Sequence, residues 1–169
     1  MGHSQADKIR SRERILEQAA AQIREGGLES VSVAKLMKSA GLTHGGFYGH
    51  FHSRSELLVH ALERALGDGR GTYHAAKKRP DPGFADIVKT YLSRQHRDSR
   101  AGGCAMAALA GDVARADLEV RAPMSEHIEG FIAGVAAALG TDDEDKALFA
   151  VSSMIGAVIV ARRVAHPAP

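Results

Sequence analysis

The segment from Thr43 to Phe51 holds the side chains whose types and spacing most clearly suggest a chemistry. Its hydroxyl, imidazole and phenol groups belong to Thr43, His44, Tyr48 and His50. Tyr48 and His50 can donate hydrogen bonds to phosphate oxygens, and His44, at the start of a short helix, can reach the edges of bases. These residue types therefore indicate contact with a nucleic acid.

Three glycines interrupt the same segment, at positions 45, 46 and 49. Each costs a helix about 1 kcal/mol relative to alanine, so a helix here must be held in place by Phe47 and Phe51. Two interpretations stay open. In one, the missing side chains let the backbone approach a groove closely. In the other, the segment is a loop whose tyrosine only packs against the protein.

Helices with recognisable start and stop signals surround this segment. A first amphipathic helix spans about residues 7–25 and stops at Gly26-Gly27, and Ser32 can cap a second that ends at Gly41. Thr43 can cap a third helix that extends to about His50. The string Ser53-Arg54-Ser55-Glu56 has the form of a capping box and starts a fourth. Two short helices joined through Gly41-Leu42 fit the helix-turn-helix plan.

The remainder of the chain is also predicted to be helical, giving an all-α fold of about eight helices. Residues 67–83 suggest a frayed helix end and a loop, because they are rich in glycine, lysine and arginine. Pro123 suits the first turn of a later helix that ends at Gly140. Thr141 or Asp142 is expected to cap the last helix, in which residues 148–161 are almost entirely apolar.

Composition narrows the class of protein. The 169 residues are 44% hydrophobic and 5% aromatic, with no tryptophan and one cysteine, which excludes an internal disulfide framework. The N-terminus lacks the apolar stretch of a signal peptide, and no run approaches the ~18 apolar residues of a membrane span. We therefore expect a cytoplasmic protein with no membrane partner. The net charge of +2 is too small to indicate nucleic-acid binding by itself.

The segment 43–51, followed by Ser53-Arg54-Ser55-Glu56-Leu57-Leu58, resembles the signature of the TetR family of bacterial transcriptional regulators. The strings at residues 14–20, 26–27 and 33–37 match the family's first two helices in order and spacing. The resemblance is specific over roughly residues 10–65 and looser beyond. It implies an N-terminal three-helix DNA-binding domain, residues 1–52, joined by a linking helix to a helical effector-binding and dimerisation domain, residues 53–169.

The resemblance also implies which residues contact double-stranded operator DNA. They are Ser32, Lys35, Thr43, His44, Gly45, Tyr48, His50 and Arg54. Those at positions 43–45 would approach bases, Tyr48 would lie against the backbone and sugar edge, and the others would contact phosphate. Gly49 departs from many family members, in which a larger side chain adds a contact, so few bases are expected to be specified there.

For the C-terminal half, the resemblance implies a homodimer through helices that include residues 145–163. The apolar pattern alone also fits a central core helix of a monomer. Family members normally carry one more helix after this one, at the point where residues 165–169 end the chain. Either the dimer is built differently, or the sequence is shorter than the gene product.

A small-molecule effector of unknown identity is expected in the same half. The predicted pocket residues are Tyr91, Cys104, Met106, Leu109, Phe131 and Met154. Cys104 begins a helix with Arg100 nearby, a setting that can lower a thiol pKa, and some family members respond to electrophiles through such a cysteine. A small buried hydrophobe is the more common role of a free cysteine.

The expected function is therefore a repressor released from a palindromic operator by a small apolar or electrophilic effector. No catalytic residues, cofactor or metal site are predicted, since His50, His52 and His60 lack a matched ligand cluster. Two alternatives stay open. One is an enzyme that uses Cys104 or a histidine, and the other is a helical interaction protein that has lost DNA binding. The sequence does not name the effector, the operator or the sign of regulation.

Overall fold

The computed structural model describes residues 5–75, 83–99 and 101–164, and every regular element within them is a helix. The expected all-α fold is thus confirmed for the described part of the chain. In chain order its elements are α1 (Gln5–Gly26), η1 (Leu28–Ser30), α2 (Val33–Ser39), η2 (His44–Gly49), α3 (Arg54–Ala75), α4 (Phe84–Tyr91), α5 (Arg94–Asp98), α6 (Ala105–Val113), α7 (Leu118–Leu139) and α8 (Glu144–Val164), where η marks a 3₁₀ helix.

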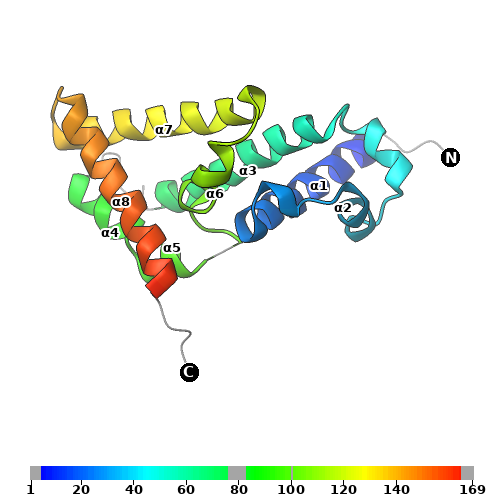
Figure 1. The fold of residues 1–169 in the computed structure, drawn as a ribbon, viewed down its shortest axis with the longest axis horizontal. Coiled ribbons are helices and arrows are strands. Elements are labelled where there is room, and N and C mark those ends of the chain that lie inside the picture. The colour runs from blue at the N-terminus through cyan, green and yellow to red at the C-terminus, as the bar shows by residue number, and fades with distance from the viewer. Residues whose placement is uncertain (1–4, 76–82, 100, 165–169) are drawn as a thin grey trace.

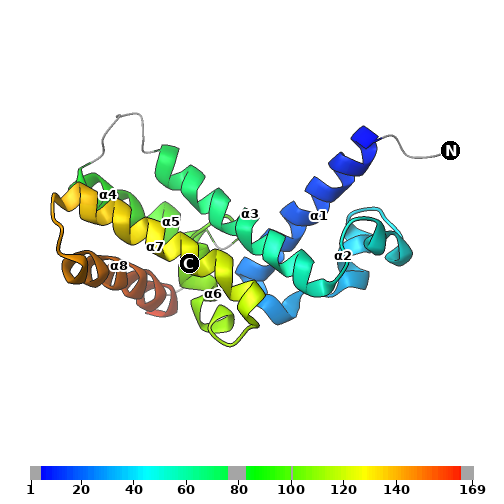
Figure 2. The same cartoon turned by 90° about the horizontal axis from the view of Figure 1, so that it is seen from above.

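The helices form two groups connected by a long one (Figures 1 and 2). One end of the molecule holds α1, α2 and η2, and the other holds α4, α5 and α8. Helix α3 packs against α1 at one end and extends alongside α7 toward the other group. Helix α6 lies at the junction, where it contacts α1, α3, α7 and α8. The predicted boundary between residues 52 and 53 stays a prediction, because α3 packs on both groups.

The N-terminal group forms around one face of α1. Ile15, Ala19 and Ile23 recur at helical spacing and are fully buried. The helix ends where Gly27 adopts a left-handed φ of 82°, a conformation that favours glycine. A side chain at this position would also collide with the carboxylate of Asp112 on α6. The glycine pair predicted to stop α1 therefore also permits close contact between the two groups.

Helix α3 begins at the predicted capping box. The Ser53 hydroxyl accepts a hydrogen bond from the backbone N–H of Glu56 at 3.0 Å. In return, the Glu56 carboxylate accepts a hydrogen bond from the backbone N–H of His52 at 2.6 Å. In a standard capping box this donor would be the N–H of Ser53, one residue later. The predicted fraying over residues 67–83 is wrong for its first part, since α3 continues to Ala75. Helix α3 as a whole packs along α7, and residues 76–82 lie outside the described residues.

Helix α7 begins earlier than predicted. It starts at Leu118, which places Pro123 in the second turn and not in the first. The earlier start is stabilised by Val120, which is buried in the core at 3% exposure. Proline lacks the N–H that would bond to the carbonyl of Glu119, but that residue lies at the surface, where water can satisfy the group.

The turn between α7 and α8 is set by a glycine and an aspartate. Gly140 ends α7 as predicted, with a left-handed φ of 62°. The residue that caps α8 is Asp143, whose carboxylate accepts the backbone N–H of Lys146 at 3.2 Å. Thr141 and Asp142 were therefore the wrong candidates. The Thr141 hydroxyl instead accepts the N–H of Asp143 at 3.1 Å, which orders the turn ahead of the cap.

Arg24, in the last turn of α1, is a buried charge that joins the two groups of helices. Only 9% of the residue is exposed. Its guanidinium donates to the Ala65 carbonyl at 3.1 Å and to the Asp68 carboxylate at 3.2 Å, both on α3. It also donates to the carbonyl of Ala101, ahead of α6. One side chain thus links three segments that are far apart in the sequence.

We predict that Arg24→Met lowers the free energy of unfolding by about 2–3 kcal/mol. The substitution keeps the apolar stem but leaves two carbonyls and the Asp68 Oδ2 atom without the Arg24 donor, while Arg64 still donates to Asp68 Oδ1. The half-exposed carboxylate makes the loss smaller than for a fully buried pair. Urea denaturation followed by circular dichroism measures the change. Arg10→Met removes an exposed pair with Asp7 and should change stability by less than about 0.5 kcal/mol. Equal effects of the two substitutions would show that burial does not matter here.

Candidate nucleic-acid interface and C-terminal cluster

The segment after α2 forms a 3₁₀ turn and not the predicted α-helix. Thr43 caps it as predicted, because its hydroxyl accepts the N–H of Gly46 at 3.3 Å. The glycines weaken regular α-helix, and the short 3₁₀ form ends at Gly49. Phe47 and Phe51 are buried at 2% and 0% exposure and hold the turn against the core. Their rings stack with centroids 5.6 Å apart.

The polar side chains of this turn project outward. Tyr48 is 70% exposed, which contradicts the interpretation that it only packs against the protein. Thr43, His44 and Gly45 are exposed beside it. The turn thus presents a phenol, an imidazole and an open stretch of backbone on one surface, as the sequence predicted. These are donors and acceptors suited to base edges and phosphates.

The predicted DNA contacts outside this turn differ in whether their side chains are already bonded within the protein. Ser32 precedes α2 but its side chain makes no capping hydrogen bond, and Lys35 is exposed on the same helix. Arg54 is already engaged within the protein, since its guanidinium donates to the Leu28 carbonyl at 3.0 Å and contacts Glu29 at 3.4 Å. Arg54 therefore ties the start of α3 to η1. Its predicted phosphate contact stays a prediction.

His50 closes the turn with its ring partly buried. Its Nδ1 is buried and has no hydrogen-bond partner among the described residues. Burial lowers the pKa of His50 below its ordinary value, and the nearby cations Lys8 and Arg12 lower it further. The imidazole is therefore uncharged at neutral pH and would meet a phosphate as a neutral hydrogen-bond donor.

In the C-terminal group, three of the predicted pocket residues meet. The Tyr91 hydroxyl lies 3.0 Å from the Cys104 sulfur, and the Tyr91 ring stacks on Phe131 with centroids 5.4 Å apart. Cys104 is 3% exposed and caps α6, because its sulfur accepts the N–H of Ala107 at 3.3 Å. The position at a helix start is confirmed, whereas Arg100 lies outside the described residues. Burial and the adjacent thiol raise the pKa of Tyr91.

Two further residues complete this cluster, and the sequence analysis missed both. His96 packs its ring 4.6 Å from Tyr91, and its Nδ1 lies 2.6 Å from the Tyr91 carbonyl. Arg162 of α8 donates to the carbonyls of Arg97 at 2.9 Å and His96 at 3.4 Å. Ser93, which caps the short α5, was the only local sign that His96 begins a buried turn. The contact with Arg162 spans 66 residues, a separation that no local pattern encodes.

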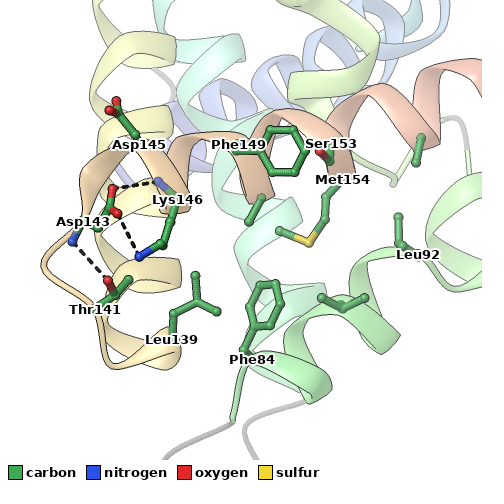
Figure 3. Close-up of a pocket in the computed structure, with 13 residues that line it drawn as sticks. Phe84, Leu92, Leu139, Thr141, Asp143, Asp145, Lys146, Phe149, Ser153 and Met154 are labelled. Atoms are coloured by element: carbon green, nitrogen blue, oxygen red, sulfur yellow. Dashed lines mark hydrogen bonds and ion pairs between the residues drawn. The ribbon is translucent and has the colours of Figure 1, made fainter.

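The other predicted pocket residues lie on α6 and α8. Met106 and Leu109 are buried on α6. Met154 lines a separate open groove of about 1030 Å³ between α4 and α8, where Phe84 and Phe149 face it from the two sides (Figure 3). The groove is mainly apolar, with a polar end formed by the turn before α8. Within the described residues, no group of three or more potential metal ligands comes together.

Comparison with known proteins identifies the N-terminal group. Residues 15–61, which span the helix-turn-helix and its flanking helices, match the family model for bacterial regulatory proteins of the tetR family. The N-terminal group is a helix-turn-helix domain of the TetR family. Its exposed turn η2 is therefore part of a DNA-binding helix-turn-helix. No curated protein matches the chain.

Solved structures of TetR-family proteins share the whole fold. A regulator from Chloroflexus aurantiacus is 22% identical with a TM-score of 0.81, covering 94% of this chain and 87% of its own. Reduced NemR from E. coli is 20% identical with a TM-score of 0.77, covering 91% and 88%. AibR, solved with isovaleryl coenzyme A and operator DNA, is 16% identical with a TM-score of 0.68, covering 94% and 89%. At such identities the likeness shows the fold alone.

The buried His96 should make the stability of the chain depend on pH. Burial lowers the pKa of His96, against the opposing hydrogen bond to the Tyr91 carbonyl, and Arg162 lowers it further. Below about pH 6.5 the His96 side chain is protonated in the unfolded chain before it is protonated in the folded chain. The free energy of unfolding is therefore highest above that pH and decreases below it.

The measurement is the free energy of unfolding in urea between about pH 8 and pH 5. This histidine should contribute a slope of at most ~1.4 kcal/mol per pH unit. His96→Gln should flatten the profile, because glutamine does not titrate. His44→Gln, at an exposed position, should keep the wild-type profile. A profile for His96→Gln as steep as that of wild type would contradict the assignment.

Proposed function

We propose that this protein is a dimeric, ligand-responsive repressor that binds a palindromic operator through the turn η2 and is released by a small effector. The DNA contacts would come from the eight residues predicted above, with the turn at the centre. The observation that carries the proposal is the outward presentation of Thr43, His44 and Tyr48 on a turn held rigidly from behind by Phe47 and Phe51. A pre-ordered turn does not have to fold when it enters a groove.

The glycines of the turn support the same function. A Cβ built at Gly45 or Gly49 meets no atom of the protein within 4 Å. Neither residue has a positive φ, so alanine could adopt the same backbone. Neither packing nor backbone conformation thus explains glycine at these positions. Close approach of DNA to the backbone would explain it at Gly45, whereas many family members carry a larger side chain at position 49.

Gly45→Ala provides the sharpest test, because it should separate stability from binding. Alanine should leave stability unchanged or raise it by about 0.5 kcal/mol, since the unfolded chain loses freedom. DNA affinity should fall at least tenfold, because the methyl group occupies the space that the DNA needs. The probe is a duplex that the wild-type protein selects from a random-sequence library, measured by gel shift at several salt concentrations.

Gly111→Ala is the matched control. Gly111 is exposed on α6, and a Cβ there also meets no atom within 4 Å. It should gain similar stability and bind the same duplex as well as wild type. Tyr48→Ala should also weaken binding, whereas Tyr48→Phe tests the hydroxyl alone. Wild-type affinity in both Gly45→Ala and Tyr48→Ala would reject η2 as the DNA contact.

Helix α8 supports the proposed dimer. Phe149, Val160 and Val164 are 76%, 60% and 65% exposed in the single chain. The helix passes the length and composition test for a membrane span, with mean hydropathy 1.7, so the expectation that no segment approaches one is wrong in that respect. We assign this apolar surface to a second copy of the chain, because exposed patches of this kind mark interfaces and a symmetric operator needs a two-fold protein.

Phe149→Asp combined with Val160→Asp should convert the protein from dimer to monomer. Two charges in an apolar interface cannot be solvated once the helices meet. Sedimentation equilibrium should give twice the chain mass of 17.9 kDa for wild type and the single mass for the variant. Leu118→Asp is the matched control, since Leu118 is an exposed leucine at the start of α7. A monomeric wild type, or a dimeric variant, would overturn the assignment.

Helix α6 offers a route from an effector to the DNA-binding turn. Cys104 caps its first turn within the buried cluster, and Asp112 near its end accepts the N–H of Leu28 at 3.2 Å. An effector that displaces α6 would move η1 and the end of α1 with it. AibR, which shares this fold, was solved with both an acyl coenzyme A and DNA.

An apolar effector suits this site better than an electrophilic one. The Cys104 sulfur is buried and already accepts one hydrogen bond, and buried structural thiols react slowly. Tyr91 and Phe131 offer aromatic surface beside it. A cytoplasmic regulator without catalytic activity fits these features, and the buried cluster shows no base placed to activate the thiol as a nucleophile among the described residues.

A further inference from the structure

On α1, the face that is buried in the core carries two positively charged side chains closer to the N-terminus. Ile15 and Ala19 are buried, and moving toward the N-terminus at the same helical spacing leads to Arg12 and then Lys8. Residues on one stripe face the same neighbours. Arg12, on this stripe, lies over the ring of Phe51, which follows His50 at the end of η2.

Arg12 is fixed in position by the protein. Its guanidinium lies 4.7 Å from the centre of the Phe51 ring, a cation–π contact that restricts its rotamers. The nearest carboxylate is that of Glu56 on α3, at 4.0 Å. Glu56 is shared with His52 at 3.0 Å and His60 at 3.9 Å, so it does not saturate the guanidinium. Arg12 thus keeps donors available at the surface.

Lys8 and His50 border the same space. Lys8 is exposed, and it forms no ion pair within the described part of the chain, whereas the neighbouring Arg10 is paired with Asp7. The field of Lys8 and Arg12 reaches the His50 ring, whose Nδ1 lacks a partner. Two cations of α1 therefore lie near the His50 ring, beside the exposed turn, and the carboxylate paired with Arg12 is that of Glu56.

We infer that Lys8 and Arg12, which are not among the contacts implied by the family resemblance, join His50 in holding one phosphate of the DNA backbone. This rests on the proposed function. An anion is the ligand that these groups lack, since the guanidinium held over Phe51, the exposed ammonium of Lys8 and the partly exposed imidazole of His50 can donate to the oxygens of a phosphodiester. The site would fix the position of the turn on the duplex without reading a base.

Salt dependence of binding provides the test, because each neutralised phosphate contributes about 0.9 to the slope of log affinity against log salt. With the duplex selected by wild type, Lys8→Gln and Arg12→Gln should each weaken binding and reduce the slope. The double variant should lose about 0.9 and not twice that value, because both cations serve one phosphate. Circular dichroism confirms that Arg12→Gln is folded, and Lys8→Gln removes only a surface charge.

Arg10→Gln is the matched control for net charge. It removes one positive charge from the same helix at a residue that is paired with Asp7 and lies off the stripe. Its slope should equal that of wild type. A slope for Lys8→Gln equal to that of Arg10→Gln would overturn the phosphate site while leaving the proposed function standing. Failure of wild type to select any duplex would instead reject the proposed function, and this inference with it.

Discussion

The burial of two phenylalanines in the core is the constraint on which the DNA-binding surface depends. Residues 44–49 contain three glycines and form only a 3₁₀ turn, so they have little tendency to be ordered alone. Phe47 and Phe51 supply the missing stability from the buried side. Burial of these two side chains thus orders the turn, and the outward-facing side chains are not needed for its stability.

Polar contacts fix the two groups of helices to each other at defined points. Arg24 binds three segments, and the Asp112 carboxylate holds the backbone of Leu28. Gly27 brings these parts together, because its conformation and the nearby carboxylate both exclude a side chain. Directional contacts of this kind have well-defined geometry, so in the proposed mechanism they would pass a displacement of α6 on to η1 and the end of α1.

The sequence predicted those features that depend on neighbours along the chain. Thr43 as a cap, Gly140 as a helix end and the buried stripe of α1 all follow from local spacing. The start of α7 and the length of α3 were mispredicted, because packing with distant helices overrode local signals. The junction of Arg162 with His96 could not be predicted, since it joins residues 66 positions apart. The DNA contacts themselves came from family resemblance, and the fold shows only that most of them are exposed.

The exposed apolar surface of α8 has a consequence for the behaviour of the protein in a cell. If two copies must meet to cover it, the amount of dimer rises with the square of the chain concentration while monomers predominate. Occupancy of a symmetric site would then respond to small changes in expression with a threshold. Through dimerisation by α8, DNA binding would then depend on the concentration of the protein itself.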